Sequence, residues 1–348
     1  MYLSQISLTN FRNFDRKVFK FDTRFTFVFG KNSQGKTNLL EAINMLLKGA
    51  GFRDSKEEEL IKLVTQHASV EGKLIDDDQN ISFKIDLVKK DYGLEKNYYL
   101  GRTKKTRHLY LKEVMSAVLF SPEQIEIIIG PPAIRRNYFD KFLSSTDPVY
   151  KTRLNNYYQA LKKRNRIFER VHNENELKEE LEFWNQYLID NGSYLTEKRK
   201  KYAEFLNSNK KIDSKVFSVK YNENVFNKTR LTEYFHEEKR LRKTLIGPQR
   251  DNFQIYLADL DVNLYGSRSE ERLALFWLKM NELKYWEGLT KKKPILLLDD
   301  IFSELDIDNQ RLVISLIGNY QTVATSTDRT LLKLIDFSNN AADHTIDL

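Results

Sequence analysis

The stretch GKNSQGKT, from Gly30 to Thr37, decides the fold. It matches the pattern G-x-x-x-x-G-K-[ST] at every fixed position. The apolar run FTFVF comes directly before it, and TNLLEAINMLLKGA, which follows, carries its leucines and isoleucine at helical intervals. When a buried strand, a glycine-containing loop and a helix follow one another in this order, the loop and the start of the helix bind the phosphates of a nucleotide. We therefore predict an α/β protein of the P-loop type.

Each fixed position of this loop has a chemical reason. Gly30 and Gly35 allow the backbone angles that turn consecutive N–H groups toward a phosphate. Lys36 supplies a positive charge for the β- and γ-phosphates, and we count it among the catalytic residues. Thr37 supplies a hydroxyl ligand for Mg²⁺. The predicted cofactors are ATP and Mg²⁺, and the predicted ATP-binding residues of this stretch are Gly30, Lys31, Asn32, Ser33, Gln34, Gly35, Lys36, Thr37 and Asn38.

A second stretch, ILLLDDIFSELD from Ile295 to Asp306, places two carboxylates at the end of an apolar run. A P-loop protein takes a further contact to Mg²⁺ from an acid at the end of a neighbouring strand, and Asp299 fits this role. Asp300 then stands where a carboxylate can face the water that attacks the γ-phosphate, as a general base or as the group that orients the water. The alternative for Asp300 is an ordinary solvated turn.

Composition narrows the class of protein. The 348 residues carry a net charge of +8, which favours a polyanionic partner such as DNA. The chain has 0 Cys, which excludes disulfides, thiolate nucleophiles and zinc–thiolate sites. No apolar run is long enough to span a bilayer, and the first residues do not have the pattern of a secretory signal. We expect a cytoplasmic protein without a membrane partner.

Four basic clusters are candidates for contact with DNA, although charge runs on helices are often only solvated faces. They lie at residues 101–108, 162–166, 197–201 and 238–243. The pattern of strands and helices predicts three segments. Residues 1–134 and 244–348 form the ATPase body, and residues 135–243, which are poor in Pro and Gly, form an inserted helical lobe.

Several motifs resemble those of a known family. The two acids followed by SELD resemble the Walker B strand and D-loop of ABC-type ATPases in the SMC-like branch. LTNFRNF, GFRDSKEEELIK, FSPEQIEIIIGPPAIRRNYFD, GPQRDNF and ATSTD, in this order along the chain, narrow the resemblance to the RecF family of bacterial DNA repair proteins. The resemblance covers nearly the whole chain. It implies an ABC-type ATPase head, with a mixed sheet, a β-subdomain and the inserted helical lobe.

The resemblance also assigns roles to single residues. Arg12 is expected near the nucleotide, and Thr327 in a switch segment. Ser303 and Asp306 of the D-loop are expected to face a second head. In the family two heads enclose two ATP molecules, and each site is completed by the partner's signature motif, here YGSRSEER. Its predicted contact residues are Ser267, Ser269 and Arg272.

Two positions of this motif depart from the family pattern, which usually has Gly at the position of Ser269 and Gln at that of Glu270. A Cβ at Ser269 restricts the approach of the backbone to a phosphate, and Glu270 brings a negative charge near an anion. Gln124 is a candidate catalytic residue that senses Mg²⁺ or the attacking water, and equally a candidate for an ordinary exposed glutamine.

The family implies an ATP-dependent DNA-binding protein of recombinational repair. It would form a homodimer on double-stranded DNA near single-strand gaps, hydrolyse ATP slowly, and promote recombinase loading with accessory proteins of the RecR and RecO type. The alternative is a scaffold that ATP assembles on DNA with little or no hydrolysis, because the signature motif is altered. The ATPase subunit of a transporter is not favoured, because the insertion is basic and nothing suggests a membrane partner.

Overall fold

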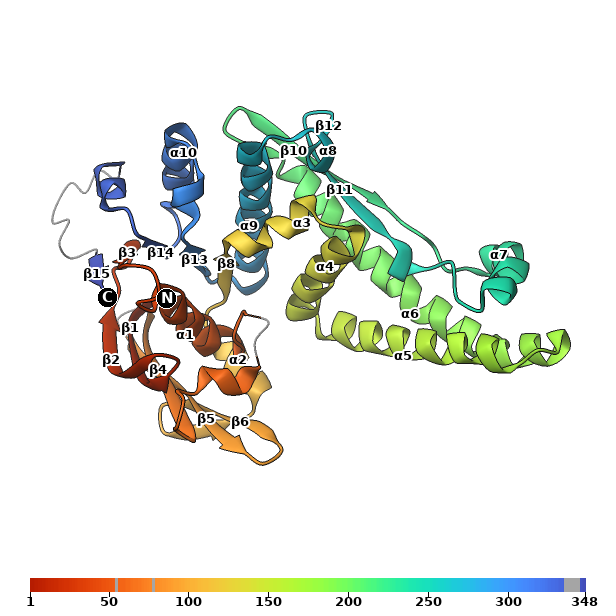
Figure 1. Cartoon of the computed structure of the whole chain (residues 1–348), viewed down its shortest axis with the longest axis horizontal. Coiled ribbons are helices and arrows are strands. Elements are labelled where there is room, and N and C mark those ends of the chain that lie inside the picture. Colours follow the sequence, from red (N-terminus) through yellow and green to blue (C-terminus); the bar gives the residue numbers. More distant parts are fainter. Residues whose placement is uncertain (54–55, 77–78, 335–344) are drawn as a thin grey trace. The chain divides into compact units, whose positions relative to one another are not determined.

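A computed structural model describes residues 1–53, 56–76, 79–334 and 345–348 (Figure 1). The chain divides into two compact units, Met1–Gln124 with Leu278–Leu348, and Ile125–Trp277. These limits differ from the predicted boundaries after residues 134 and 243, and they place the signature segment in the second unit. Asp54 and Ser55, which belong to one of the family-like segments, lie outside the described residues.

The first unit contains a five-stranded parallel sheet. Its strands, in spatial order, are β15 (Thr345–Asp347), β3 (Phe25–Phe29), β14 (Thr322–Ser326), β13 (Ile295–Asp299) and β8 (Ala117–Phe120). All residues of β8, β13 and β14 are buried, as is usual for parallel strands with both faces covered.

A second sheet of this unit is antiparallel and six-stranded. Its order is β2 (Phe14–Lys20), β1 (Tyr2–Phe11), β4 (His67–Asp76), β5 (Gln79–Lys90), β6 (Gly93–Leu100) and β7 (Thr103–Lys105). Along β4 the buried residues are Ala68, Val70, Gly72 and Leu74, so every second residue faces the core.

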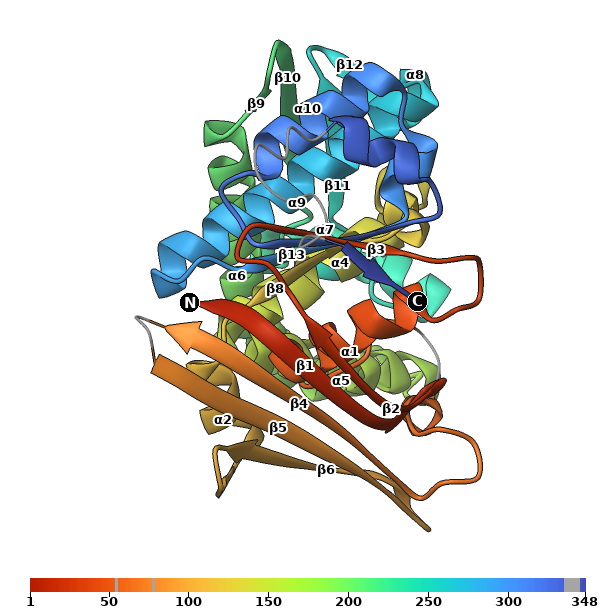
Figure 2. The same cartoon turned by 90° about the vertical axis from the view of Figure 1, so that its left-hand side faces the viewer.

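Helix α1 (Lys36–Lys48) contacts strands of both sheets, and Figure 2 shows it between them. Its leucines and Ile43 share one core with residues of both sheets. Gly72 permits the close approach of α1 to β4, because a Cβ there would lie 2.2 Å from the Leu46 Cδ2. The other helices of this unit are α2 (Arg107–Glu113), α10 (Ile307–Ile317) and the C-terminal part of α9 (Arg268–Thr290).

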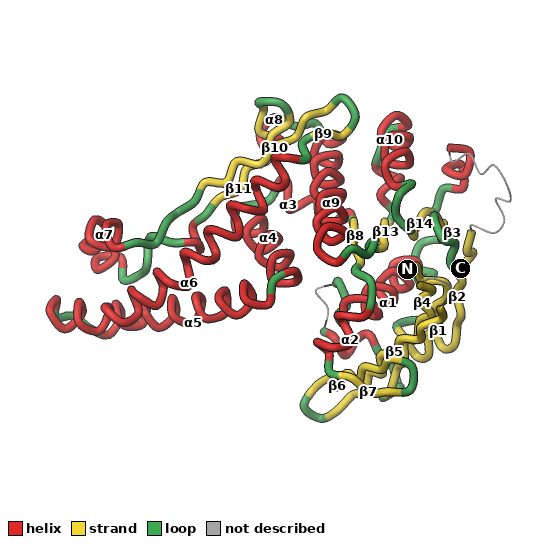
Figure 3. The backbone as a smooth tube through the Cα atoms, turned by 180° about the vertical axis from the view of Figure 1, so that it is seen from behind, coloured by secondary structure: helices red, strands yellow, loops and turns green. Residues whose placement is uncertain are grey.

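The second unit combines helices with a small sheet (Figure 3). Its helices are α3 (Glu126–Ile129), α4 (Pro132–Thr146), α5 (Pro148–Arg170), α6 (Glu174–Ser208), α7 (Lys228–Leu241), α8 (Val262–Tyr265) and the start of α9. Its strands are β9 (Lys211–Ile212), β10 (Lys215–Asn222), β11 (Asn252–Leu257) and β12 (Leu260–Asp261). The predicted helical lobe, residues 135–243, therefore also contains two strands that were not predicted, β9 and β10.

Two arginines of the predicted basic clusters are buried in this unit. Arg199 is 0% exposed and pairs with both Asp140 and Asp251, at 2.8 and 2.7 Å. Arg164 is 1% exposed and pairs with Glu238 at 2.7 Å. These side chains tie helices and strands together and are not available to DNA, which corrects their assignment to the basic surface.

Among the described residues, no helix combines the length and the apolar character that crossing a membrane requires.

Candidate ATP-binding site

The parallel sheet brings the predicted motifs to one edge. In the register of the strands, Phe29 is opposite Ser326, Thr325 is opposite Asp299, and Leu298 is opposite Phe120. Because the strands run in the same direction, the segments that follow them leave the sheet at the same edge. The P-loop follows β3, and the switch residue Thr327 follows β14. Asp300 follows β13, and Gln124 lies shortly after β8.

The P-loop has a backbone conformation that depends on glycine. Gly35 has a φ of +110° and precedes the first residue of α1. A Cβ at Gly35 would also lie 2.7 Å from the Asn13 Nδ2, so glycine is required for two reasons. Lys36 is only 8% exposed, and its Nζ donates to the carbonyl oxygens of Gly30 (2.8 Å) and Lys31 (3.1 Å). The ammonium group therefore lies over the loop that binds phosphate.

The hydroxyl of Thr37 joins the P-loop to the acidic strand end. Thr37 Oγ1 donates to Asp299 Oδ1 at 3.0 Å, and Thr325 Oγ1 donates to the same oxygen at 2.9 Å. Burial raises the pKa of Asp299, although the two hydroxyl hydrogen bonds and the charge of Arg53 oppose the shift. A hydroxyl and a carboxylate side by side are hard oxygen ligands, and a dication would favour the charged form of this buried carboxylate. Thr37 and Asp299 therefore fit Mg²⁺.

Asp300 occupies an unusual backbone position, with a φ of +49°. Its N–H donates to Thr325 Oγ1 at 3.0 Å, and its carbonyl oxygen accepts from Ser303 Oγ at 2.8 Å. Aspartate tolerates the left-handed region better than most residues, but the conformation still costs energy. Thr325 thus contacts both aspartates. Sequence reasoning missed Thr325 because its place beside them follows only from the pairing of β13 with β14.

A hydrogen-bonded group surrounds the start of α1. The Arg12 guanidinium donates to both oxygens of the Glu41 carboxylate, from Nε at 2.7 Å and from Nη2 at 3.1 Å. Arg53 donates to Asn38 Oδ1 at 2.9 Å, and Asn38 donates to Asn13 Oδ1 at 2.7 Å. Arg12 and Asn38 were predicted, whereas Asn13, Glu41 and Arg53 were not.

Asn13 supports the loop directly, since its Nδ2 donates to the carbonyl oxygen of Gln34 at 3.0 Å. All three missed residues lie inside or beside motifs that the sequence analysis quoted. Their spacing alone did not indicate a contact with the loop.

Comparison with known proteins identifies the family. A model described as the RecF/RecN/SMC N terminal domain matches residues 2–336. The protein called DNA replication and repair protein RecF of Natranaerobius thermophilus is 32% identical, over 94% of this chain and 91% of the relative. The chain belongs to the RecF family. A second relative of the same name, from Caldanaerobacter subterraneus subsp. tengcongensis, is also 32% identical, over 95% of each chain.

Solved structures agree with this assignment to the RecF family. One, described as the recombination mediator protein RecF-ATPrS in the RecFOR pathway, has a TM-score of 0.80 at 31% identity and covers 95% of this chain and 93% of that one. An SMC head domain, 16% identical, matches with a TM-score of 0.55 over 97% of this chain and 92% of that chain, which concerns the fold alone. The predicted ABC-type ATPase head of the RecF family is confirmed.

Three other predicted residues of the first unit, Gln124, Ser303 and Asp306, have local partners. Gln124 Oε1 accepts from the Ser121 N–H at 3.3 Å. Asp306 caps α10 by accepting from the Asn309 N–H at 2.8 Å, and Ser303 donates to the carbonyl oxygen of Asp300. Thr327 is exposed directly after β14. The predicted roles of these RecF-family positions toward a nucleotide or a second head stay predictions.

The signature segment forms a capping box at the start of α9. Glu270 Oε2 accepts from both the N–H and the hydroxyl of Ser267, each at 2.8 Å, and the Glu270 N–H donates to Ser267 Oγ at 3.4 Å. The hydrogen bonds from Ser267 lower the pKa of Glu270, so its carboxylate is charged at neutral pH. Ser269 in the first turn of α9 and Arg272 in the second turn are both half-buried. The glutamate that departs from the usual RecF-family residue therefore has a structural role of its own.

Proposed function

We propose that this chain is a DNA repair ATPase of the RecF type. It binds ATP with Mg²⁺ and closes as a homodimer on double-stranded DNA near single-strand gaps. Slow hydrolysis of ATP then releases the homodimer from the DNA. In this role it promotes recombinase loading with accessory proteins of the RecR and RecO type, and it acts in the cytoplasm. The hydrogen bond between Thr37 and Asp299, 3.0 Å long, joins the P-loop to the end of β13, which β14 separates from the strand before the P-loop. This hydrogen bond is the observation that carries the nucleotide part of the proposal.

The names of the relatives support the rest. The similar curated proteins are DNA replication and repair proteins, and two solved relatives are described as RecF-ATPrS and RecF-ATP in the RecFOR pathway. ATP in this scheme acts as a switch, because binding favours one arrangement of the heads and hydrolysis removes the bias.

Each residue of the site has a part in this scheme. Lys36 neutralises the charge of the phosphates, and the backbone from Gly30 to Gly35 surrounds the phosphates. Mg²⁺, held by Thr37 and Asp299, would neutralise charge that develops on the phosphate oxygens. Asp300 accepts a proton from water or orients the water, and the Thr325 hydroxyl holds the backbone of Asp300 in place.

Exposed lysines and arginines of the basic clusters are the proposed contacts to DNA phosphates. Without Arg164 and Arg199, the exposed candidates are Arg102, Lys104, Arg107, Lys162, Lys163, Arg166, Lys200, Lys201, Arg240, Arg242 and Lys243. Contacts of this kind bind DNA without reading its sequence and weaken as salt rises.

Replacing the P-loop lysine tests the proposal. Lys36→Ala should reduce ATP binding by at least about 100-fold, because the variant lacks the buried ammonium group that donates to the carbonyl oxygens of the loop. Equilibrium titration with a fluorescent ATP analogue measures the change. Lys17→Ala, at an exposed position of β2, is the control and should bind as the parent protein does. Unchanged affinity in Lys36→Ala would refute the assignment of the site.

The Ser267–Glu270 hydrogen bonds favour a second candidate, the ATP-assembled scaffold with little hydrolysis. These hydrogen bonds engage the backbone N–H and the hydroxyl of Ser267, the serine that the family places against the partner's γ-phosphate. A turnover assay with duplex DNA present separates the two candidates. Phosphate release no faster than in Asp300→Asn supports the scaffold, and DNA-stimulated release above that control supports the ATPase.

A further inference from the structure

Arg135 is a buried arginine without the carboxylate partner that the other buried arginines of its unit have. It is 5% exposed, on α4. Arg164 and Arg199 are buried to a similar degree, and both pair with carboxylates. In the part of the chain that the structure describes, no ion pair is formed by Arg135. Burying a charge without a directly paired carboxylate is costly, so this site calls for an explanation.

The hydrogen bonds of Arg135 account for one side of the guanidinium. Its Nη1 donates to the carbonyl oxygens of Ile128 (3.2 Å) and Gly130 (2.7 Å), at the end of α3. Its Nε is buried and has no hydrogen-bond partner. Burial lowers the pKa of Arg135, and Asp261 opposes the shift only in part. The protein thus leaves a buried donor unsatisfied.

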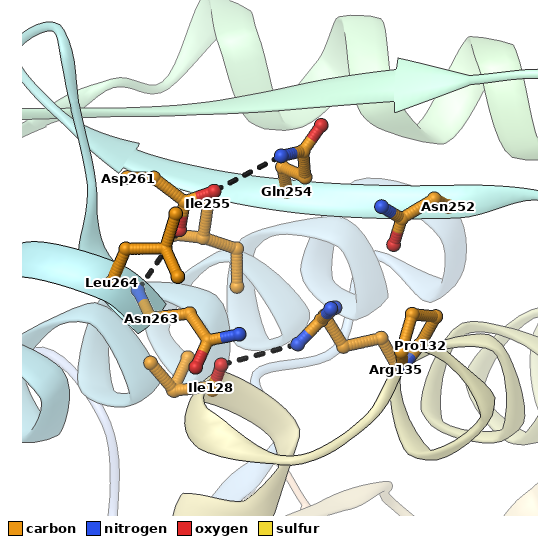
Figure 4. A pocket seen from close by; sticks show the side chains of 9 residues that line it. All are labelled: Ile128, Pro132, Arg135, Asn252, Gln254, Ile255, Asp261, Asn263 and Leu264. Carbon is orange, nitrogen blue, oxygen red and sulfur yellow. Dashed lines mark hydrogen bonds between the residues drawn. The ribbon is translucent and has the colours of Figure 1, made fainter.

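Arg135 lines a cavity of about 260 Å³ (Figure 4). The apolar part of the lining consists of Ile128, Pro132, Ile255 and Leu264. The polar part consists of Arg135, Asn252, Gln254, Asp261 and Asn263. The Asn252 Oδ1 is also buried without a partner, so two residues of the same lining each carry an unsatisfied polar group. Such groups are normally satisfied by water or by a ligand.

Two of the other polar side chains of the lining, Gln254 and Asp261, are already engaged. Asp261 accepts from the Gln254 Nε2 and from the Asn263 N–H, both at 3.0 Å, and Gln254 Oε1 accepts from the Asn222 Nδ2 at 2.7 Å. Gln254 and Asp261 therefore define a fixed wall. The unsatisfied groups of Arg135 and Asn252 are left to bind what enters.

We propose that this cavity is a binding site for a small carboxylic acid that also carries a hydroxyl group. A carboxylate is planar and matches the edge of a guanidinium group with two parallel hydrogen bonds. The hydroxyl donates to Asn252 Oδ1, and the apolar walls contact the hydrocarbon part. Asp261 shares the cavity, so the charges of Arg135, Asp261 and one carboxylate sum to −1. A phosphate dianion would leave −2 and is disfavoured.

Thermal unfolding of the whole chain tests the site, with chloride as the ionic-strength control. We expect 3-hydroxybutanoate and butanoate to raise the Tm with saturation, the hydroxy acid at lower concentration, and phosphate to act no differently from chloride. N-acetylglutamate 1-amide represents a carboxylate carried by a protein chain. If N-acetylglutamate 1-amide reaches half-saturation at a lower concentration than butanoate, the ligand is a carboxylate on a partner's side chain. If it reaches half-saturation at a higher concentration, the ligand is a free acid.

Asn252→Asp supplies the carboxylate from the protein itself. This variant should have a higher Tm than the parent without added acid, and it should lose the response to both acids. Asn155→Asp is the matched control, because Asn155 is exposed on α5 and is not part of the cavity lining. It should keep the response. Arg135→Lys should raise the half-saturating concentration at least about tenfold, since an ammonium group cannot form the paired hydrogen bonds.

The proposal fails if the acids stabilise the protein no more than chloride does. It also fails if phosphate stabilises the protein more than the acids do, or if Asn252→Asp responds to the acids as the parent does. None of these readouts involves ATP or DNA, so they are independent of the proposed function.

Discussion

Asp299 is a carboxylate whose charge serves ligand binding at the expense of stability. Its side chain is buried, and burial raises its pKa above the usual 3.8. The folded state therefore holds this proton more tightly than the unfolded state does. The stability cost is absent below the usual pKa, grows as the pH rises through the interval up to the raised pKa, and is complete above it.

Asp299→Asn should therefore raise the Tm at pH 7, by a few degrees, while weakening the binding of Mg²⁺-ATP. The asparagine Oδ1 can still accept from the hydroxyls of Thr37 and Thr325, so the shape of the site is kept. Thermal unfolding at pH 7 and at pH 3.5 measures the effect, and the gain should shrink at the lower pH. Asp259→Asn, at an exposed turn, is the control and should leave the Tm unchanged. A lower Tm for Asp299→Asn at pH 7 would contradict the argument.

Arg199 shows the opposite case, a buried charge that the fold needs. Arg199→Met leaves Asp140 and Asp251 buried without their counter-charge. The variant should lose about 3–5 kcal/mol of unfolding free energy. Urea unfolding, followed by tryptophan fluorescence, measures the loss. Lys201→Met, on the same helix but exposed and paired with the exposed Glu197, should change it by less than about 0.5 kcal/mol. Equal effects of the two substitutions would argue against a structural role of the Arg199 pairs.

At the scale of elements, the sequence predicts those whose local pattern is strong. The strand before Gly30, helix α1 and the strand that ends at Asp299 all follow from apolar runs and one loop motif. Strand β10 was missed although Phe217, Val219 and Tyr221 alternate with polar residues, because the long helical patterns around it dominate the composition. The contact of Thr325 with both aspartates was not predictable either, because it arises from pairing between strands distant in sequence.

Helix α9 gives a prediction about the signature segment. A capping box accepts Glu or Gln at its third position, so Glu270→Gln should keep the hydrogen bonds to Ser267 and the stability of the helix. It removes one negative charge from the segment that is proposed to meet the partner's ATP. The ATP concentration for half-maximal dimerisation should fall by about threefold, which corresponds to about 0.6 kcal/mol.

Sedimentation over a series of ATP concentrations measures this change. Glu176→Gln is the matched control, because Glu176 is an acid in the first turn of another helix, α6. It should have no effect on dimerisation. If Glu270→Gln dimerises at the same ATP concentration as the parent, then the capping box does not oppose ATP, and the role of Glu270 is confined to the helix start.

For the whole molecule, burial does not reduce the basic surface below the net charge of +8, because the described residues bury five lysines and arginines and seven carboxylates. Arg135, Arg164 and Arg199 are buried, and two of them neutralise carboxylates inside the second unit. The sequence identified the basic clusters but could not separate surface from interior, because helical charge runs look alike until their packing is known. Electrostatic attraction of DNA therefore depends on the exposed lysines and arginines that remain.

Asp300→Asn tests whether the molecule works as a pair of heads. Asparagine has the shape of aspartate but cannot take a proton from the attacking water, so hydrolysis should fall by about 10²–10⁴-fold while ATP binding persists. The backbone hydrogen bond from residue 300 to Thr325 is kept. Sedimentation velocity with ATP and duplex DNA should then show a lasting dimer, whereas the parent protein returns to monomer as ATP is consumed. If the variant binds ATP and stays monomeric at high protein concentration, the two-headed ATP site is wrong for this protein.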